Sequence, residues 1–331
     1  MPLSTQDLNQ LVRDTLDEVT GYGPLEPLLA DPRINDILVN GPDSVFIEVA
    51  GVLQKASVRF INDDHVVRVI RRMLAPLGRR LDESSPMVDA RLPDGSRVNA
   101  IIPPLALDGP SISIRKFTRH HLGAQELIDS GSLTEACLDT MVKAVESRRN
   151  IIISGGTGTG KTTMLNLISQ YIPRQERILT IEDSAELVLN HPHVVRLETR
   201  PANTEGKGRI SARELVINAL RMRPDRIILG EVRSNEIIEL LQAMNTGHDG
   251  SMSTIHANST RDALVRIETL LAVSGYEASE TAIGRLIGSA LDIIIQLERL
   301  PDGRRRVSEV VALTPTEHDL YHMDYLYRSQ T

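Results

Sequence analysis

The stretch SGGTGTGKTT, residues 154–163, constrains the fold more than any other part of the chain. It follows the apolar run Ile151–Ile153 and leads into TTMLNLISQY, whose apolar spacing predicts a helix. Gly155 to Thr162 matches the pattern G-x-x-x-x-G-K-[ST], and a strand before it with a helix after it is the setting of a phosphate-binding P-loop. Such a loop occurs in parallel sheets that carry helices on their faces, so the stretch predicts an α/β fold.

The residue types in this stretch explain how it would hold a nucleotide. Gly155, Gly158 and Gly160 allow the backbone to turn its N–H groups inward around an anion, and the helix N-terminus adds partial positive charge. We expect Lys161 to reach the β and γ phosphates of ATP and the Thr162 hydroxyl to ligate Mg²⁺. The residues of the loop predicted to bind ATP or ADP are Gly155, Gly156, Thr157, Gly158, Thr159, Gly160, Lys161, Thr162 and Thr163.

Carboxylates follow two further apolar runs. ILTI leads into Glu182, Asp183 and Glu186, and RIILG leads into Glu231. Because the carboxyl ends of parallel strands meet at one edge of a sheet, we expect these groups beside the P-loop, where they could hold Mg²⁺ through water or orient a water molecule. Gly230 stands where many P-loop ATPases have a magnesium-binding aspartate, so Glu231 is expected to act through water. We favour Glu231 as the water-orienting residue, and Glu186 as a support for Mg²⁺ or the alternative base.

The stretch GHDGSMSTIH contains two histidines and an aspartate, which raises the question of a zinc site. Zinc would need further ligands in tetrahedral geometry, and no cysteine is nearby. His248 and Asp249 precede the predicted strand and His256 ends it, so the three side chains could converge only at a cost in shape. We expect Thr254 and His256 near the phosphates and His248 nearer a subunit contact, where neutral imidazoles could respond to phosphate loss.

Composition excludes several classes of protein. A net charge of −7, no Trp and only three Phe disfavour a nucleic-acid coat, since single-strand binders combine basic grooves with aromatic platforms. No apolar run reaches the roughly 18 residues of a membrane span, and the N-terminus lacks the pattern of a signal peptide. The single cysteine, Cys137, cannot form an internal disulfide, which fits a reducing compartment. These features predict a cytoplasmic protein.

Cys137 lies in a segment with helical periodicity. Four residues recur every four positions on one helical face: Leu133, Cys137, Met141 and Val145. A buried core thiol is therefore the simplest interpretation. Ser132 followed by Glu135 has the spacing of a capping box, which predicts where this helix begins.

The chain of 331 residues is long enough for two domains. Residues 1–117 predict an N-terminal α+β domain, with strands in NDILVNG, DSVFIEVAG and GPSISIRKF and a hairpin in ARLPDGSRVNAIIP. Residues 118–131 predict an interdomain linker. Residues 132–331 alternate apolar runs and helices, which predicts a mainly parallel sheet, and DIIIQLERLPDGRRRVSEVVAL predicts a terminal hairpin.

With these motifs in order, the chain resembles the secretion ATPase superfamily that drives type II secretion, type IV pili and type IV secretion. The resemblance rests on RMRPDRIILGEVR, on TGHDGSMSTIHANS and on four nucleotide elements. These are Walker A (Gly155–Thr162), the aspartate box (Glu182–Glu186), Walker B (Ile227–Glu231) and the histidine box (Gly247–His256). In the N-terminal half, GYGPLEPLL, INDILVNGP and RLPDGSRVNAIIPPL look most similar to the CpaF/TadA branch, the motors of tight-adherence (Flp) pili.

The resemblance implies a RecA-like P-loop ATPase domain in a homohexamer, with arginines of the N-terminal domain reaching the phosphates when the domains close. The matching positions are Arg97 and Arg115, with Arg91 as a further candidate, and Arg233 after Walker B is expected to contact ATP. The implied function is a motor that powers assembly, and possible retraction, of a tight-adherence pilus. Its implied partners are inner-membrane platform proteins and, indirectly, pilin subunits.

Two other functions stay open at this point. A type IV secretion traffic ATPase is the alternative, and a DNA-translocating RecA-like ATPase is the third reading. One cysteine cannot build the tetracysteine zinc module of the type II secretion and pilus-extension motors, so that branch is disfavoured.

Overall fold

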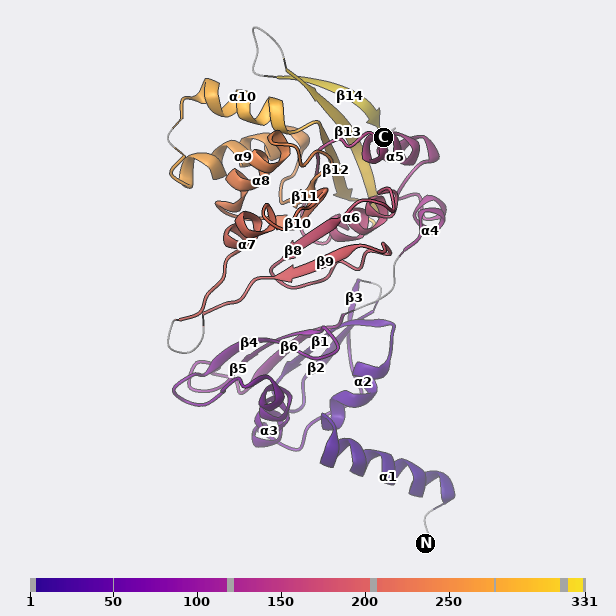
Figure 1. Cartoon of the computed structure of the whole chain (residues 1–331). Coiled ribbons are helices and arrows are strands. Elements are labelled where there is room, and N and C mark those ends of the chain that lie inside the picture. The colour runs from indigo at the N-terminus through magenta and orange to yellow at the C-terminus, as the bar shows by residue number, and fades with distance from the viewer. Residues whose placement is uncertain are drawn as a thin grey trace. The chain divides into compact units, whose positions relative to one another are not determined.

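The computed structural model describes residues 4–49, 51–117, 122–202, 207–276, 278–315 and 321–329. The chain divides into two compact units, Met1–Arg119 and His120–Thr331 (Figure 1). Among the described residues, no helix is both long and apolar enough to cross a lipid bilayer.

The N-terminal unit contains an antiparallel sheet in the strand order β3-β2-β1-β6-β5-β4. Its strands are β1 (Ile34–Asn40), β2 (Val45–Val49), β3 (Val52–Lys55), β4 (Met87–Arg91), β5 (Arg97–Ile101) and β6 (Ser111–Arg115). Valine and isoleucine alternate with polar residues along β5 and β6, so each strand has one buried and one more exposed face. All strands expected here are present, and β3 is an addition that the sequence did not reveal.

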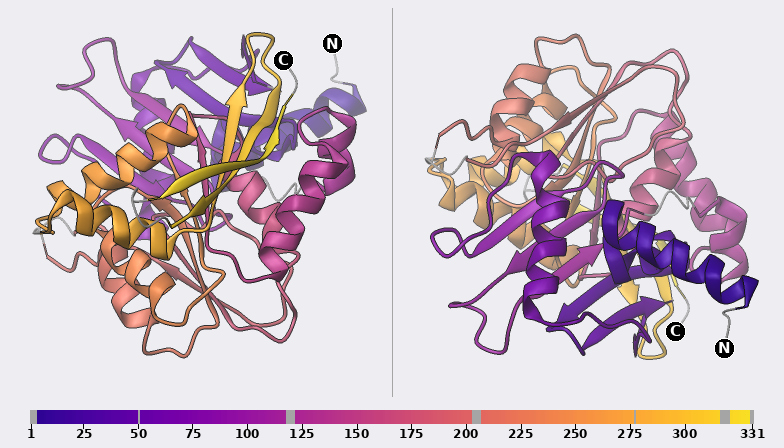
Figure 2. Two further views of the ribbon diagram at one scale, coloured as in Figure 1. Left: turned by 90° about the horizontal axis from the view of Figure 1, so that it is seen from above. Right: turned by 90° about the horizontal axis from the view of Figure 1, so that it is seen from below.

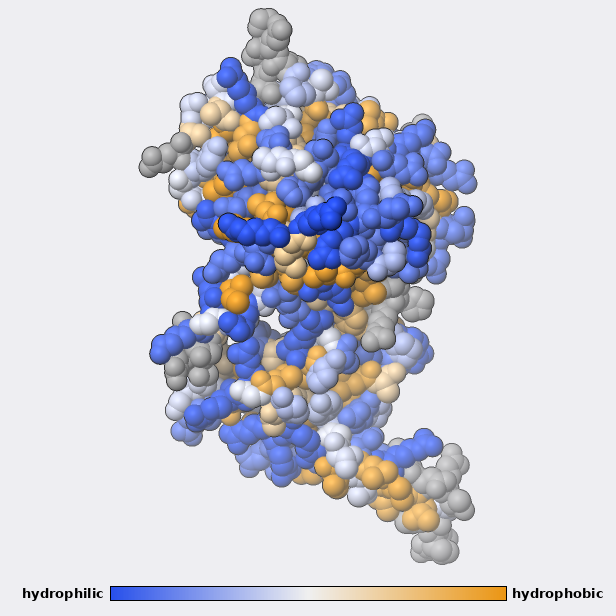
Figure 3. All heavy atoms as spheres, in the orientation of Figure 1, coloured by the Kyte–Doolittle hydropathy of each residue, from blue (hydrophilic) through white to orange (hydrophobic). Residues whose placement is uncertain are grey.

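Helices precede and interrupt the strands of this sheet along the chain. They are α1 (Thr5–Thr20), α2 (Glu26–Ala30) and α3 (Asp63–Leu74), with short 3-10 turns η1 (Gly23–Leu25) and η2 (Ala75–Leu77). The Asn62 side chain caps α3 by accepting a hydrogen bond from the backbone of His65, and the buried face of α3 packs onto the sheet. By contrast, α1 leaves Leu11, Val12 and Leu16 about half exposed, and Figure 3 shows apolar side chains gathered over it.

The C-terminal unit contains a larger, mainly parallel sheet in the order β14-β13-β12-β7-β11-β10-β8-β9. Its strands are β7 (Ile151–Gly155), β8 (Ile178–Glu182), β9 (Val194–Glu198), β10 (Arg226–Val232), β11 (Met252–Ile255), β12 (Ile293–Arg299), β13 (Arg305–Thr314) and β14 (His322–Arg328). The strands from β12 to β9 are parallel to one another. Beyond β12 the sheet continues through two antiparallel pairings, β12 with β13 and β13 with β14. This confirms the expected parallel sheet and the terminal hairpin.

Helices lie on both faces of the larger sheet (Figures 1 and 2). They are α4 (Ala124–Asp129), α5 (Glu135–Glu146), α6 (Lys161–Ser169), α7 (Ala212–Ala219), α8 (Glu236–Asn245), α9 (Thr260–Val273) and α10 (Glu280–Ala290). The apolar faces of α7–α10 join one core cluster and those of α4–α6 join a second. The α/β fold class, with a smaller α+β unit before a larger unit built on a mainly parallel sheet, is therefore confirmed.

One predicted helix cap is wrong. The helix α5 begins after Thr134, whose hydroxyl accepts a hydrogen bond from the Cys137 backbone, so Ser132 lies outside it. Thr134 has extended backbone angles, and motif spacing alone does not show at which residue the helical conformation starts. The helix α8 begins after Asn235, and the Glu236 carboxylate accepts hydrogen bonds from the backbone of Arg233 and Ser234.

The interdomain linker expected at residues 118–131 stays a prediction. Its residues 118–121 lie outside the described part of the chain. Within the remainder, Ala124–Asp129 forms α4, and Leu127 packs in the core cluster that α5 and α6 share. This part of the segment therefore belongs to the C-terminal unit.

Cys137 should resist alkylation while the protein is folded. The side chain is fully buried, and burial raises the pKa of the thiol to about 12, whereas thiolate is the reactive form. We expect iodoacetamide at pH 8 to leave the native protein unmodified under conditions that label it completely in guanidinium chloride, as measured by intact mass. Equal labelling of the native and unfolded protein would contradict this placement.

Candidate nucleotide site

The P-loop joins the C-terminal end of β7 to the first turn of α6. Gly158 and Gly160 adopt positive φ angles of 70° and 97°, a region that side chains with a Cβ rarely enter. A Cβ at Gly155 would overlap the Thr159 hydroxyl and lie 3.0 Å from the Leu297 carbonyl oxygen. The glycines that the motif requires are thus explained by backbone conformation and by close packing against β12.

Lys161 turns its side chain back over the loop. Its Nζ donates hydrogen bonds of 2.9 Å to the carbonyl oxygens of Gly155 and Gly156. Burial lowers the pKa of Lys161, and the nearby Glu231 carboxylate acts in the opposite direction. The Thr159 hydroxyl donates to the Gly156 carbonyl at 3.0 Å, which makes Thr159 part of the loop's own bonding. The arrangement supplies inward backbone groups and one ammonium group, which suits a chain of phosphates.

The parallel register brings the predicted carboxylates to the same sheet edge as the loop. Ser154 on β7 pairs with Ile255 on β11, and Ile255 also pairs with Val232 on β10. The neighbouring pair Leu229 and Ile181 aligns β10 with β8. Glu231, near the C-terminal end of β10, and the aspartate box, which begins at the last residue of β8, therefore lie at the same end of the sheet as the P-loop, as the sequence predicted from strand direction.

Arg233 connects the two acidic elements. Its Nε and Nη2 each lie 2.6 Å from Oε2 of Glu231, and its Nη1 lies 3.4 Å from the Asp183 carboxylate. The contact of Arg233 with ATP stays a prediction, and the structure shows for this residue an ion pair that the sequence did not suggest. It draws Walker B and the aspartate box together through paired charges.

Glu182 differs from the other acidic residues. It is only 4% exposed, and Oε2 accepts backbone hydrogen bonds from Glu186 and Leu187. Burial raises its pKa, and these two hydrogen bonds act in the opposite direction. The sequence grouped Glu182 with the groups that hold Mg²⁺ or water. That role stays a prediction, and the structure shows that Oε2 of Glu182 holds the backbone of the loop that carries Glu186.

The histidine box spans both edges of the sheet. His256 follows the C-terminal end of β11, at the edge of the P-loop, and is exposed. The Thr254 hydroxyl donates to the Gly230 carbonyl at 2.8 Å, so it bonds to β10. His248 precedes the N-terminal end of β11, at the opposite edge. If His248 contacts a nucleotide, it would therefore be one bound by a neighbouring subunit. This contact stays a prediction.

The described residues contain no group of three or more His, Cys, Asp or Glu side chains placed to hold a metal ion. The histidines of the box, His248 and His256, are separated by the whole of β11.

In the N-terminal unit, the three arginines named from the sequence lie in a row across neighbouring strands. Arg91 on β4 pairs with Arg97 on β5, and Arg97 pairs with Arg115 on β6. Residues directly opposite in antiparallel strands place their side chains on the same face, and like charges there are unfavourable unless an anion compensates them. The sheet thus brings Arg91, Arg97 and Arg115 together, which their sequence spacing did not show.

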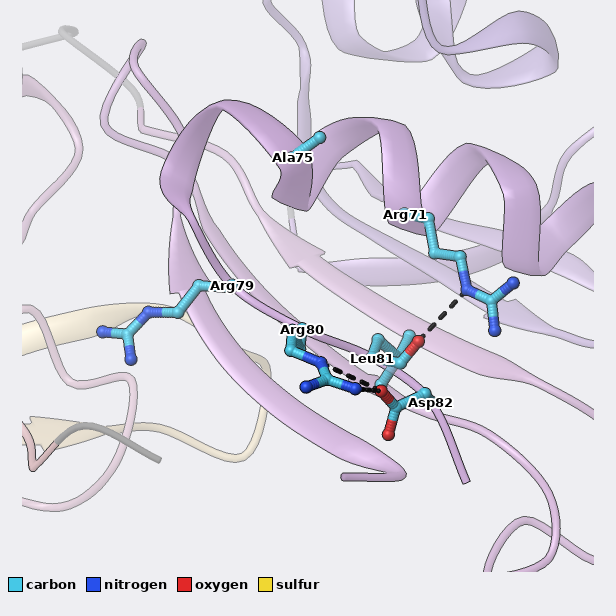
Figure 4. Close-up of a pocket in the computed structure, with 6 residues that line it drawn as sticks. All are labelled: Arg71, Ala75, Arg79, Arg80, Leu81 and Asp82. Carbon is cyan, nitrogen blue, oxygen red and sulfur yellow. Dashed lines mark hydrogen bonds and ion pairs between the residues drawn. The ribbon is translucent and has the colours of Figure 1, made fainter. Parts of the chain in front are cut away.

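A hollow of about 320 Å³ in the N-terminal unit lies beside α3 and η2 (Figure 4). It is lined by Arg71, Ala75, Arg79, Arg80, Leu81 and Asp82. Arg80 and Asp82 pair at 2.6 Å across it, and Arg71 donates to the Leu81 carbonyl. None of the predicted site residues lines this hollow.

Sequence reasoning missed Asn150, the residue before β7. Its amide nitrogen donates to the Met244 and Ala290 carbonyls, and its oxygen accepts from the backbone of Gly250 and Ser251. One buried amide thus ties the turn of the histidine box to the strand that leads into the P-loop. A polar residue directly before the apolar run Ile151–Ile153 was the available signal.

Comparison with known proteins shows the family to which this chain belongs. A family model described as "Type II/IV secretion system protein" matches residues 18–325. The chain belongs to this family. Within this secretion ATPase family, a Mycobacterium tuberculosis protein provisionally assigned to conjugal transfer is 38% identical over 306 residues, covering 91% of this chain and 86% of its own. The type IV secretion system protein VirB11 of Brucella suis is 31% identical over 319 residues, covering 87% and 88%.

A solved structure supports the fold of this secretion ATPase. The pilus retraction motor PilT with bound ADP matches with a TM-score of 0.62, covering 86% of this chain and 80% of its own. Its sequence identity is 22%, so the likeness concerns the fold alone. The named relatives come from conjugal transfer and type IV secretion, and the finer CpaF/TadA assignment is not confirmed by them.

Proposed function

We propose that this chain hydrolyses ATP to drive a type IV secretion or conjugal transfer machinery. The observation that carries the proposal is the convergence of the P-loop, Glu231 and the loop bearing Glu186 at one edge of the parallel sheet. The sequence favoured a tight-adherence pilus motor, whereas we favour type IV secretion or conjugal transfer, because the relatives named above are a protein provisionally assigned to conjugal transfer and a VirB11 protein.

The residues at this edge suit a magnesium nucleotide. The glycine-rich turn and the Lys161 ammonium, which bonds to the loop, would suit a phosphate chain, and Thr162 in the first turn of α6 would be the hydroxyl ligand of Mg²⁺. Glu231 and Glu186 would hold water, either around the metal or for attack on the γ-phosphate. Bound Mg²⁺ would supply charge neutralisation of the phosphates.

The arginine row of the N-terminal unit is proposed to complete the site when the two units close in a homohexamer. A guanidinium that meets the transferred phosphoryl group stabilises its spreading charge. Hydrolysis would remove that attraction and release the N-terminal unit, which would turn ATP turnover into movement. The proposed setting is the inner membrane, reached through partner proteins.

Arg97→Ala should lower kcat for ATP by about 10²-fold while ATP binding stays nearly intact, because the charge is needed most in the transition state. Phosphate release and equilibrium binding of ATP measure the two quantities. Arg68→Ala on the exposed face of α3 is the matched control and should keep the wild-type rate. A wild-type kcat in Arg97→Ala would remove the proposed cross-domain role.

The machinery served is tested in cells. When Glu231→Gln replaces the wild-type chain, cells should lose conjugal DNA transfer or protein secretion by their type IV system. The alternative, a tight-adherence pilus motor, rests on the N-terminal motifs such as GYGPLEPLL. Loss of surface pili with normal DNA transfer and secretion would favour that branch.

A DNA-translocating ATPase is the third reading. The net charge of −7 and the low aromatic content disfavour it. Stimulation of ATP turnover by single-stranded DNA, with no dependence on secretion partners, would support it instead.

A further inference from the structure

The loop that carries Asp183 and Glu186 is anchored by a carboxylate beneath it. Oε2 of Glu182, the last residue of β8, accepts hydrogen bonds of 2.7 Å from the Glu186 backbone and 2.8 Å from the Leu187 backbone. A buried carboxylate is costly unless hydrogen-bonded, so these contacts tie the path of the loop to the end of the strand. The first of the two bonds holds Glu186 itself.

We propose that Glu182 is a positioning residue that holds Glu186 at the nucleotide edge of the sheet. The proposal rests on the proposed ATPase function. Glu182 does not need to contact the nucleotide, because its effect passes through the backbone of Glu186. A shift of about 1 Å in a catalytic group can cost about 10²-fold in rate, so an anchor of this kind would control turnover.

Gly230 on β10 supports this assignment independently. A Cβ at this position would lie 3.0 Å from Cγ and 3.6 Å from Cβ of Glu182. The absence of a side chain therefore leaves room for the Glu182 side chain to reach the loop. This accounts for glycine at the Walker B position where many P-loop ATPases have aspartate.

The neighbouring strand β9 holds the same loop from its other side. The Ala185 backbone donates to Oε2 of Glu198 at 2.9 Å, and Arg196 donates to the Ala185 carbonyl at 3.3 Å. The loop between β8 and Leu187 is thus fixed by side chains from two parallel strands. Among these contacts, the one from Glu182 is made directly to the backbone of Glu186.

Two substitutions separate its hydrogen-bonding role from its charge. Glu182→Ala removes the acceptor and should lower kcat for ATP by about 10- to 100-fold, with little change in KM. Glu182→Gln keeps an oxygen that can accept both hydrogen bonds and should retain kcat within about 3-fold. Unchanged turnover in Glu182→Ala would overturn the proposal.

A double-mutant cycle shows whether the effect passes through Glu186. In a Glu186→Ala background, Glu182→Ala should have almost no further effect on kcat, because there is no side chain left to position. If Glu186→Ala has no measurable turnover, Glu186→Asp takes its place and should give a reduced effect. An equal loss in both backgrounds would mean a merely structural role and would overturn the proposal.

Glu239→Ala is the matched control. Glu239 on α8 is also a buried glutamate, 7% exposed, but it pairs with Arg213 rather than with the loop. We expect this variant to lose thermal stability, with an effect on kcat that is the same in both Glu186 backgrounds. Gly230→Ala should instead behave like Glu182→Ala, since the new Cβ displaces the Glu182 side chain.

Hydrogen exchange gives a readout that does not need activity. Deuterium uptake of a peptide covering residues 183–187, followed by mass spectrometry, should be slow in the wild type and in Glu182→Gln. In Glu182→Ala and Gly230→Ala it should be faster by on the order of 10-fold. Equal uptake in all four proteins would overturn the anchor. A wild type without ATP turnover would instead refute the proposed function, and the exchange result would still test the loop.

Discussion

Lys161→Ala is expected to reduce ATP turnover by on the order of 10³-fold, the largest effect of any single substitution proposed for this chain. Its ammonium group is the cation that the P-loop itself contributes, and it already faces the loop through hydrogen bonds to the Gly155 and Gly156 carbonyls. Alanine would leave the β and γ phosphates without that charge both in the bound state and during transfer. Phosphate release measures turnover, and calorimetry with ATP should show weaker binding.

The control for this experiment is Lys143→Ala. Lys143 lies in the last turn of α5 and is exposed, so removing it changes the net charge by the same amount without touching the loop. We expect its turnover and melting temperature to match the wild type. If Lys161→Ala kept turnover within about tenfold of wild type, the phosphates would have to bind elsewhere.

Glu231→Gln should abolish most turnover, by about 10²- to 10³-fold, and leave ATP binding in place. The amide keeps the size of the side chain but cannot take a proton from water. Stability should change little, because the Glu231–Arg233 ion pair is partly exposed and such pairs contribute about 0–1 kcal/mol. Single-turnover phosphate release and equilibrium ATP binding separate the two effects.

Asp82→Asn provides a matched loss of an ion pair, since Asp82 pairs with Arg80 at 2.6 Å in the N-terminal unit. It should leave turnover unchanged. Glu186→Gln, measured beside Glu231→Gln, decides the division of labour that the sequence left open. A clearly greater loss in Glu186→Gln would make Glu186 the base and Glu231 the supporting residue.

The P-loop shows how much local sequence can predict. Its strand, glycines, lysine and helix lie within about twenty consecutive residues, so one continuous pattern encodes the whole element. The strands around it were predictable from apolar runs because parallel strands buried on both faces are apolar throughout. Strands such as β9, with a mixed burial pattern at the edge of the sheet, gave no such signal.

The aspartate box shows where local reasoning ended. The sequence placed Glu182 and Glu186 at the same end of one strand and singled out Glu186 as a support for Mg²⁺ or the alternative base. The structure separates them, because Glu182 is the last residue of β8, which is buried along its whole length, while Glu186 follows in the loop. Glu182 is the carboxylate that bonds to the loop backbone. It has room to do so because Gly230 on the neighbouring strand β10 has no side chain.

The sequence by itself determined the P-loop and the α/β class. It also assigned the acidic and histidine elements to the same fold as the P-loop, since each of these elements is a short stretch of residues close together in the chain. Only the tertiary structure decided the row formed by Arg91, Arg97 and Arg115, the pairing of Arg233 with Glu231, and the anchoring of Glu186 by Glu182. These contacts depend on strand register, and register is set by the packing of whole sheets rather than by any single stretch of residues.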